Sequence, residues 1–368
     1  MTMHLPAGWT LRDVIALTLL RGAHATAIRA AVETSANLEA AVAAPLPVLA
    51  RALGQSDLFG ERTIEVLRQR ADDLLATVEA IGARVLTLWD AEYPALLRQT
   101  SYPPVVLYVH GYLQQADALA IAIVGTRRCT TYGRLCAERF AQEFARAGCV
   151  VVSGLANGID SIAHAVTLDA GGITYAVIGS GLDRICPAPS RRLADRIIAG
   201  GGAVLSEYPP GTAARPGYFP QRNRIISGIA RAVLVVESRR EGGSLITAHF
   251  ALDQSRDLFA VPGNITAPTS EGTNLLIARQ KAQAAISPEQ VLAELGIAPA
   301  PAPMAAPVEL VSPLEQQLWD ALSSEPQSAD DLAATLDRPV AEVLSTLLMM
   351  EFRGIVRQLA GKQFIRTQ

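Results

Sequence analysis

The sequence has few cysteines, no membrane-length apolar run and no leader-like start. Its 368 residues include four cysteines, Cys129, Cys136, Cys149 and Cys186, and none of them forms a Cys-x-x-Cys pair. This spacing gives a zinc site or a redox dithiol no support and favours buried free thiols in a reducing compartment. No apolar run approaches the roughly 18 residues of a membrane span, and no basic cluster precedes an apolar segment at the start. We therefore expect a cytoplasmic protein without a membrane partner.

Signatures of catalysis and cofactor binding are also missing. The chain has only two lysines, Lys281 and Lys362, and neither lies in the G-x-x-x-x-G-K-[ST] pattern of a P-loop. The five histidines form no H-E-x-x-H motif or Cys/His cluster, and there is no G-x-S-x-G elbow. A G-x-G-x-x-G fingerprint fails because Arg184 stands at its third glycine. These absences do not exclude an enzyme, but they leave no candidate catalytic residue, and we expect no metal ion and no cofactor.

The charge of the chain is uneven. Half of the residues are hydrophobic and the formal net charge is only −3, which by itself indicates no anionic partner. Residues 1–119 carry a net charge of −3, residues 120–286 carry +6 and residues 287–368 carry −6. A basic centre between two acidic flanks indicates that the centre binds an anionic partner.

The pattern of apolar residues divides the chain. Apolar spacing before residue 81 predicts several short helices, because prolines interrupt it, and residues 81–118 predict two short strands. Alternating proline and alanine near residue 300 predict an extended linker. We therefore place a helical domain at 1–80, an α/β domain at 81–295, a linker at 296–309 and a winged-helix domain at 310–368.

The last segment has the element order of a winged helix, with three helices and then a hairpin. Ser328 and Asp331 stand in the positions of a helix cap. In the third helix one buried face is predicted by the spacing of its apolar residues, namely Val340, Val343, Leu344, Leu347 and Leu348.

The central segment predicts a parallel sheet. Six short apolar runs, each followed by a Gly- or Ser-containing loop and a helical stretch, occupy residues 119–124, 149–153, 173–178, 203–207, 232–237 and 258–262. Strands that are apolar on both faces and alternate with helices predict a sheet covered on both sides. The expected fold class is therefore α/β, with a Rossmann-like, doubly wound, mostly parallel sheet. Its ligands are expected at the carboxyl ends of the strands.

Five loops rich in glycine, serine and arginine are predicted at that edge of the sheet, at residues 122–133, 153–164, 179–193, 219–228 and 241–250. In the first loop, Gly125 and Arg127 precede a helix start, where a phosphate would meet free N–H groups and a guanidinium. Any one of these loops alone could equally be an ordinary turn or helix start. Five of them in the basic third of the chain indicate a phosphate-binding surface.

At these loops the sequence resembles the DprA/Smf family of bacterial DNA-processing proteins. The matching segments include GTRRCTTYG (125–133), SGLANGID (153–160), GSGLD (179–183), FPQRNRIISG (219–228) and GGSLITA (242–248), in order within residues 90–286. The resemblance implies a Rossmann-like domain that binds single-stranded DNA without sequence preference, between a SAM-like helical domain and a winged helix. It also implies a homodimer that protects incoming strands and loads the RecA recombinase during natural transformation, and a protein that is not an enzyme. The cell's single-stranded DNA-binding protein is a further candidate partner.

The resemblance also implies which residues contact DNA. Gly125, Thr126 and Arg127 match the family's Gly-Ser-Arg phosphate loop, so Arg127 is the first choice. The family's basic residue after the G-x-G-x-D segment is missing here, and Arg191 or Arg192 is proposed as a substitute. The expected DNA-binding set is Gly125, Thr126, Arg127, Arg128, Ser153, Gly154, Asn157, Gly158, Asp160, Gly179, Gly181, Asp183, Arg191, Arg192, Arg222, Asn223, Arg224, Gly243, Ser244 and Thr247.

Two other functions stay open. One is a nucleotide phosphoribohydrolase-type enzyme on the same fold, although its P-G-G-x-G-T-x-x-E signature is missing. The other is a transcriptional regulator that reads duplex DNA with its winged helix. Residues 310–368 carry five basic and eight acidic residues, a net charge of −3, which favours a protein contact over duplex binding.

Overall fold

The structure of the chain is a computed structural model that describes residues 4–20, 23–43, 61–114, 119–298, 310–323, 326–359 and 361–366. Contacts divide the chain into two compact units, Met1–Ala300 and Pro301–Gln368. This division falls within the segment predicted as a linker at 296–309, most of which lies outside the described residues. Within the described ranges, no helix is both long enough and apolar enough to cross a membrane.

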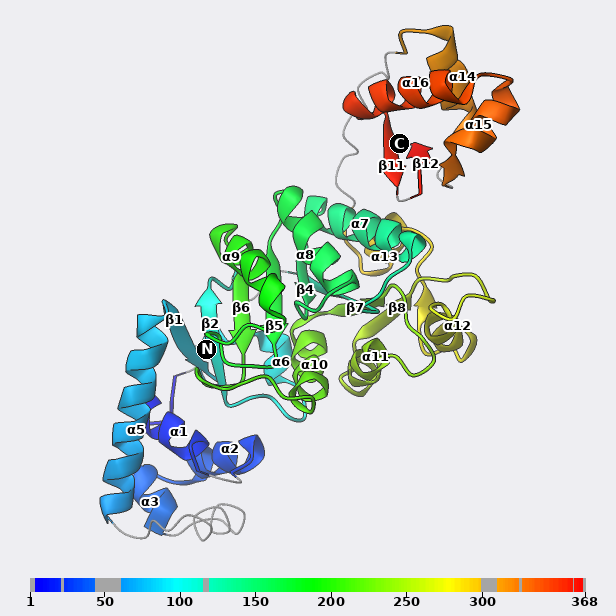
Figure 1. Ribbon diagram of the computed structural model, residues 1–368. Coiled ribbons are helices and arrows are strands. Elements are labelled where there is room, and N and C mark those ends of the chain that lie inside the picture. Colours follow the sequence, from blue (N-terminus) through cyan, green and yellow to red (C-terminus); the bar gives the residue numbers. More distant parts are fainter. Residues whose placement is uncertain are drawn as a thin grey trace. The chain divides into compact units, whose positions relative to one another are not determined.

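The first unit is built on one nine-stranded sheet in the order β1-β2-β6-β5-β4-β3-β7-β8-β9 (Figure 1). Its centre consists of the six predicted strands, which run parallel: β3 (Ala120–Val124), β4 (Val150–Ser153), β5 (Thr174–Ile178), β6 (Ala203–Ser206), β7 (Ala232–Val235) and β8 (Asp257–Ala260). The predicted fold class, a mostly parallel α/β sheet with a helical N-terminal region and a C-terminal winged helix, is confirmed.

The two ends of the sheet were less evident from the sequence. The predicted strands of the 81–118 segment are β1 (Ala83–Thr87) and β2 (Val106–Gly111), and β2 pairs antiparallel with β6. They therefore extend the main sheet instead of only leading into it. At the opposite edge, the short β9 (Gln283–Ala284) pairs in parallel with β8.

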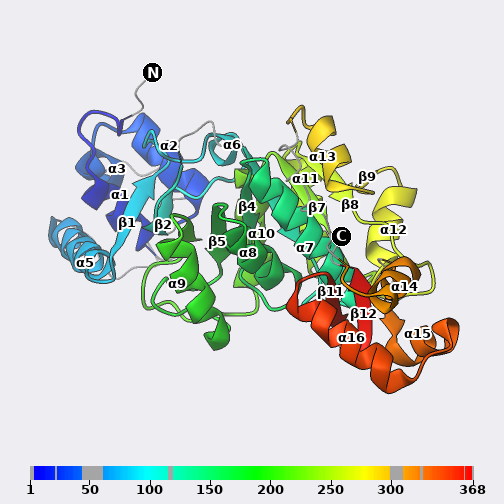
Figure 2. The same ribbon diagram turned by 90° about the horizontal axis from the view of Figure 1, so that it is seen from above.

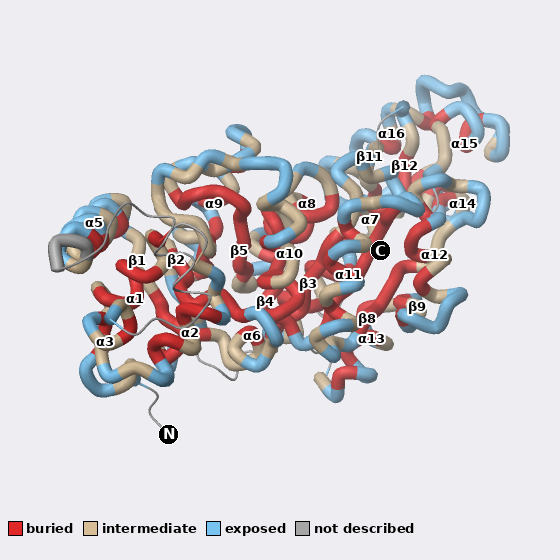
Figure 3. The backbone as a smooth tube through the Cα atoms, turned by 90° about the horizontal axis from the view of Figure 1, so that it is seen from below, coloured by how far each residue is buried: buried red, intermediate tan, exposed pale blue. Residues whose placement is uncertain are grey.

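Helices cover both faces of the sheet (Figures 1 and 2). One face carries α7 (Thr131–Arg146), α8 (Ile159–Asp169), α9 (Arg191–Ala199) after the turn η1 (Ala188–Ser190), and α13 (Pro288–Glu294); the other carries α6 (Ala95–Arg98), α10 (Tyr218–Ile229) and α11 (Ser244–Asp253), while α12 (Glu271–Ala278) follows β8. In β3, Ile121 and Ile123 pack in the same core as α7, whereas Ala122 and Val124 pack in the core shared with α10. Every central strand is therefore buried on both sides, as Figure 3 shows.

The N-terminal region consists of α1 (Leu11–Thr18), α2 (Ala25–Thr34), α3 (Leu38–Ala43) and α5 (Glu61–Ala80). The expectation of short helices only is wrong for α5, which has 20 residues. Its sequence contains neither proline nor glycine, so nothing in it ends the helix early. Leu67, Ala71 and Val78 of α5 are buried in one apolar core that continues into the sheet.

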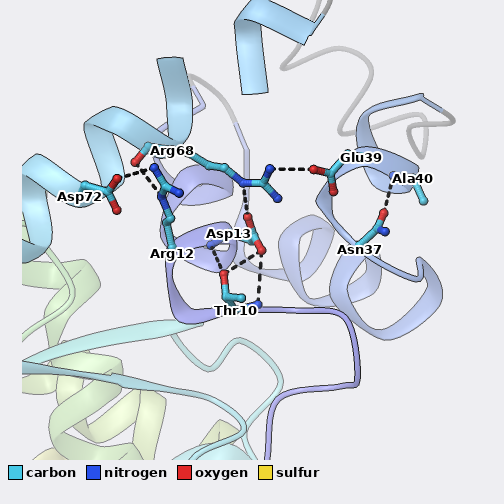
Figure 4. Close-up of polar contacts among 8 residues, drawn as sticks. All are labelled: Thr10, Arg12, Asp13, Asn37, Glu39, Ala40, Arg68 and Asp72. Carbon is cyan, nitrogen blue, oxygen red and sulfur yellow. Dashed lines mark hydrogen bonds and ion pairs between the residues drawn. The ribbon is translucent and has the colours of Figure 1, made fainter. Parts of the chain in front are cut away.

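A polar network holds these helices together (Figure 4). Asp13, nearly buried on α1, completes a capping box with Thr10 and accepts a 2.7 Å hydrogen bond from Arg68 Nε of α5. The same guanidinium donates to Glu39 of α3 at 2.7 Å, and Arg12 pairs with Asp72. The bond to Asp13 is the main reason that the pKa of Arg68 is raised. One arginine of α5 thus links α1 to α3.

Replacing Asp13 by alanine is expected to lower the free energy of unfolding by about 2–3 kcal/mol, because α1 loses the Asp13 half of its capping box and Arg68 loses its buried partner. Glu39→Ala is the matched control, since that carboxylate is 50% exposed and an exposed pair contributes about 1 kcal/mol or less. Urea titration of the full chain, followed by circular dichroism, measures both changes. Equal, small losses for the two variants would contradict the assignment of Asp13 as the central residue of the network.

The second unit has the predicted winged-helix order. It contains α14 (Pro313–Ala321), β10 (Gln327–Ser328), α15 (Ala329–Leu336), α16 (Val340–Phe352), β11 (Val356–Leu359) and β12 (Gln363–Arg366), with a three-stranded sheet ordered β10-β12-β11. Ser328 caps α15 by accepting a hydrogen bond from Asp331 N, as the sequence predicts.

The buried face of α16 differs from the predicted one. Val343 and Leu347 are buried as expected and Met350 joins them, but Val340 and Leu348 are 44% and 38% exposed. Because α16 is apolar nearly all round, its spacing does not select a single face. Met349 and Phe352, which are 59% and 88% exposed, lie on the outside of the same helix.

Candidate nucleic-acid interface

A cleft of about 640 Å³ lies at the carboxyl edge of the parallel strands. It is bordered by the loops after β3 and β7, which are neighbours in the sheet, and by α10. Strands β4, β5 and β6 follow on one side of β3, and β7 and β8 lie on the other. The helices after β3 and β7 therefore leave on opposite faces and open a crevice at this point. The structure places the cleft where an α/β sheet binds its ligands.

The loop after β3 forms the first wall of the cleft. Gly125, Thr126 and Arg127 line it, and Thr126 N donates to the carbonyl of Glu237 at 2.9 Å. Gly158 packs beneath this loop with φ +85°, and a Cβ at Gly158 would lie 2.3 Å from the Thr126 carbonyl oxygen. Only glycine fits there without displacing the loop. Gly158 therefore shapes the loop after β3 and does not itself line the cleft.

Arg127 is exposed at the rim of the cleft, and its guanidinium lies 5.5 Å from the centre of the Phe219 ring. Phe219 lines the cleft beside it. The ring face restricts the arginine and leaves its N–H groups available to a phosphate.

The second wall corrects a sequence expectation. Residues 219–228 were expected to be a loop, but they lie within the helix α10. Successive residues of a helix point about 100° apart, so Arg222, Asn223 and Arg224 do not act on one surface. Arg222 and Asn223 line the cleft, whereas Arg224 donates to Glu207 in a 2.5 Å ion pair.

Arg222 lies at the floor of the cleft and is 4% exposed. Its Nη1 donates to the carbonyl of Val177. Its side chain fits only because residue 154 is glycine, since a Cβ at that position would lie 2.0 Å from Nη1. Burial lowers the pKa of Arg222 to about 10, and the nearby Asp160 carboxylate opposes that shift. Burial likewise raises the pKa of Asp160, and Arg222 opposes it. The two residues stabilise each other's charge beneath the loop after β3.

The third wall is the loop after β7 with the start of α11. Ser238, Arg239, Gly242, Gly243 and Ser244 all line the cleft. The expected DNA-binding set did not include Arg239. The pair Arg239 and Arg240, close before the two glycines, could have indicated it from the sequence. Its exposed guanidinium gives the rim a second positive charge opposite the loop after β3.

Nine residues of the expected DNA-binding set line this cleft: Gly125, Thr126, Arg127, Asp160, Arg222, Asn223, Gly243, Ser244 and Thr247. Their sequence positions extend from 125 to 247, and only the strand order brings them together.

Other expected residues serve the protein's own structure. Ser153 is buried and donates to the Ile123 carbonyl at 2.6 Å, and Gly179 packs against the Phe219 ring. Gly181 N donates to the Thr212 carbonyl, and Asp183 accepts from Gly211 N at 2.8 Å. These contacts position the loop that follows β6.

The remaining expected residues, Arg128, Asn157, Arg191 and Arg192, are exposed and lie outside the lining of the cleft. Arg191 and Arg192 begin α9, where Arg191 Nη1 makes a long, 3.4 Å contact to the Asp183 carbonyl. The expected buried state of the thiols holds for Cys149 alone, because Cys129 and Cys136 are half-buried and Cys186 is exposed.

A stacked aromatic pair lies next to Phe219. The rings of Tyr208 and Tyr218 are 4.1 Å apart at 22°, and the Arg215 guanidinium lies 5.8 Å from the Tyr218 ring centre. Flat aromatic and guanidinium faces of this kind are suited to stacking with bases.

His164, buried on α8, provides a pH-dependent prediction. Thr174 Oγ1 donates to the Val151 carbonyl, so His164 Nδ1 must donate to Thr174 Oγ1 at 2.6 Å, and burial lowers the pKa of His164 to about 3. The pKa of His164 in the folded protein lies below the unfolded value of about 6.5. The stabilisation from its neutral imidazole is therefore fully present above pH 6.5 and decreases as the pH falls below that value. At pH 5 the free energy of unfolding is lower by about 2 kcal/mol than at neutral pH.

Replacing His164 by asparagine is expected to remove that loss, since asparagine cannot be protonated. Urea unfolding of both proteins at pH 7 and pH 5 measures the difference, and Asp160, which titrates in the opposite direction, is present in both. The same pH dependence in wild type and variant would show that another group is responsible.

Two family models and several known proteins match the chain. The family model described as DNA recombination-mediator protein A matches residues 84–296, and the DprA winged helix domain model matches residues 298–362. Protein Smf from Synechocystis sp. is 33% identical over 357 residues, which are 86% of this chain and 89% of that protein.

Two solved structures are similar. DNA processing protein A (DprA) from Streptococcus pneumoniae has a TM-score of 0.64 at 33% identity, covering 77% of this chain and 98% of that one. DNA processing protein A from Helicobacter pylori has a TM-score of 0.52 at 30% identity, covering 58% and 95%, and was described for its single-stranded DNA binding mode.

Proposed function

Because the chain belongs to the DprA/Smf family of DNA recombination-mediator proteins, we propose that it binds single-stranded DNA without sequence preference in the cleft between β3 and β7. The observation that carries this proposal is the convergence of Arg127, Arg222 and Arg239 on one cleft in the only basic third of the chain. Phosphate contacts dominate, since they carry no sequence information and the aromatic residues near the cleft are few.

Fluorescence anisotropy of a labelled oligo-dT at two salt concentrations tests this proposal. Affinity is expected to fall steeply as salt rises, because bound arginines release the counterions of the strand. An unlabelled single strand should compete, and a duplex of the same length should not. No binding, or a preference for duplex, would overturn the proposal and favour a nucleotide hydrolase or a regulator. Turnover of mononucleotides would single out the hydrolase.

The wider role rests on family membership. We propose that the chain acts in the cytoplasm as a homodimer that protects incoming strands and hands them to the RecA recombinase. The single-stranded DNA-binding protein that coats such strands is a further candidate partner.

We propose that the winged helix contacts protein and not duplex DNA. The helix α16 contains Glu342 and Glu351 but no basic residue, and it exposes Met349 and Phe352. A helix that reads the major groove needs cationic or amide side chains on its exposed face.

Deleting residues 297–368 is therefore expected to leave the affinity for oligo-dT within about threefold of the full chain. The remaining residues form a unit with its own core. Anisotropy with the same oligonucleotide measures the effect. A loss greater than tenfold, about 1.4 kcal/mol, would place the winged helix in the DNA site.

A further inference from the structure

The inner part of the cleft has unused hydrogen-bonding groups. Ser244, on the first turn of α11, is 8% exposed, and its hydroxyl has no hydrogen-bond partner among the residues that the structure describes. Arg222 is 4% exposed, and within the same described ranges its Nε has no partner either. Both residues line the cleft. Buried polar groups are normally paired, so two unpaired groups in one cleft point to a ligand that completes them.

The N-terminus of α11 adds to this anion-binding character. The helix has ten residues, and its N-cap, Gly243, provides no side-chain hydrogen bond. Leu245 N and Ile246 N already donate to the carbonyls of Gly242 and Gly243, so it is the helix dipole that favours an anion at this end. Glycine is required at position 242 in the turn, because a Cβ there would lie 2.2 Å from Ser238 Oγ.

The depth of these donors selects the form of phosphate. Arg127 and Arg239 are exposed at the rim, whereas Ser244 and Arg222 lie below it. An internal phosphodiester continues as chain in two directions and exposes two free oxygens. A terminal phosphate monoester has one chain and three free oxygens, so it can enter end-on, and it carries a charge of about −1.5 to −2 at neutral pH.

We propose that the inner end of the cleft, formed by Ser244, Arg222 and the N-terminus of α11, is a pocket for a phosphate monoester, which a single strand fills with its terminal phosphate. The proposal rests on the proposed binding of single strands in the same cleft. A cleft of about 640 Å³ is in the range of sites for small ligands. Rim arginines then hold the next phosphates of the strand.

The test compares dT oligonucleotides of about six nucleotides, a length typical of such grooves, with a 5′-phosphate, a 3′-phosphate or hydroxyls at both ends. A phosphorylated strand is expected to bind the full chain about tenfold more tightly, and thymidine monophosphate should compete where thymidine does not. The preferred strand identifies which end enters the pocket. Equal binding of all three strands, with no competition by the monophosphate, would overturn the proposal.

Two variants locate the effect. Ser244→Ala should lose the preference for the phosphate, so that the phosphorylated strands and the hydroxyl strand bind it with equal affinity. Ser244→Asp places a carboxylate at the helix start, which preserves the fold and repels the monoester, so thymidine monophosphate should no longer raise its melting temperature. Ser345→Ala, at an exposed position of α16, is the matched control.

Retention of the preference in both Ser244 variants would also overturn the proposal. If wild type binds none of the strands, the proposed function fails. In that case the shift in melting temperature with thymidine monophosphate tests the pocket independently of strand binding: a shift supports the pocket, and no shift overturns it.

Discussion

Replacing Arg127 by alanine is expected to weaken the binding of single strands by about ten- to a hundredfold, the effect of losing one or two charge-assisted hydrogen bonds worth about 1.5–3 kcal/mol. Arg127 stands at the rim of the cleft, oriented by the Phe219 ring, with its N–H groups available to a phosphate. Since phosphates are the same in every sequence, oligo-dT and mixed sequences should lose equal affinity.

The salt dependence separates this contact from a folding defect. One lost phosphate contact lowers the slope of log affinity against log salt by about 0.7 for a single strand. Arg139→Ala is the matched control, since Arg139 is an exposed arginine on α7 that pairs with Glu289 at a distance of 3.8 Å. Anisotropy at several salt concentrations measures affinity and slope together. An unchanged affinity for Arg127→Ala would remove this residue from the interface.

Arg222→Ala is expected to lower the free energy of unfolding by about 3–5 kcal/mol, because it leaves a buried carboxylate without its compensating charge. Asp160 is the carboxylate concerned, and the Val177 carbonyl loses its donor as well. The guanidinium also fills the space against Gly154, so its removal leaves a cavity. Urea unfolding of the full chain measures the loss.

A double-mutant cycle shows whether the two charges are coupled. Asp160→Ala combined with Arg222→Ala should cost less than the sum of the single changes, since neither charge is then left alone. Arg196→Ala is the control, because Arg196 is 52% exposed and pairs with an exposed Asp169, so it should cost about 1 kcal/mol or less. Strict additivity of the two buried changes would refute the coupling.

The elements of this protein could be predicted from its sequence because their signals are local. The six central strands are apolar on both faces, and that pattern is typical of a parallel sheet between two layers of helices. Ser328 with Asp331 predicted a helix start correctly, since a cap involves residues three apart. The Gly-Thr-Arg loop after β3 could be located for the same reason, and its role in binding phosphate stays a prediction.

Residues 219–228 show where local reasoning ended. Their glycine, asparagine and arginine content resembles a loop, yet burial of Ile225 and Ile226 against the sheet holds them in α10. Tertiary packing overrides weak propensity when an apolar face is buried. In α16 the opposite problem arose, because an apolar surface all round contained no information on which side the unit would cover.

The sequence by itself determined the strands, the order of the domains, the basic centre and the loops that carry Arg127 and Ser244, because each depends on residues close together in the chain. Only the tertiary structure decided that the loops after β3 and β7 share a cleft, since strand order is set by long-range packing. It also decided that Arg222 is buried while Arg224 pairs with Glu207. Burial depends on what the rest of the fold places around a side chain, so two arginines only two positions apart in the sequence have different environments.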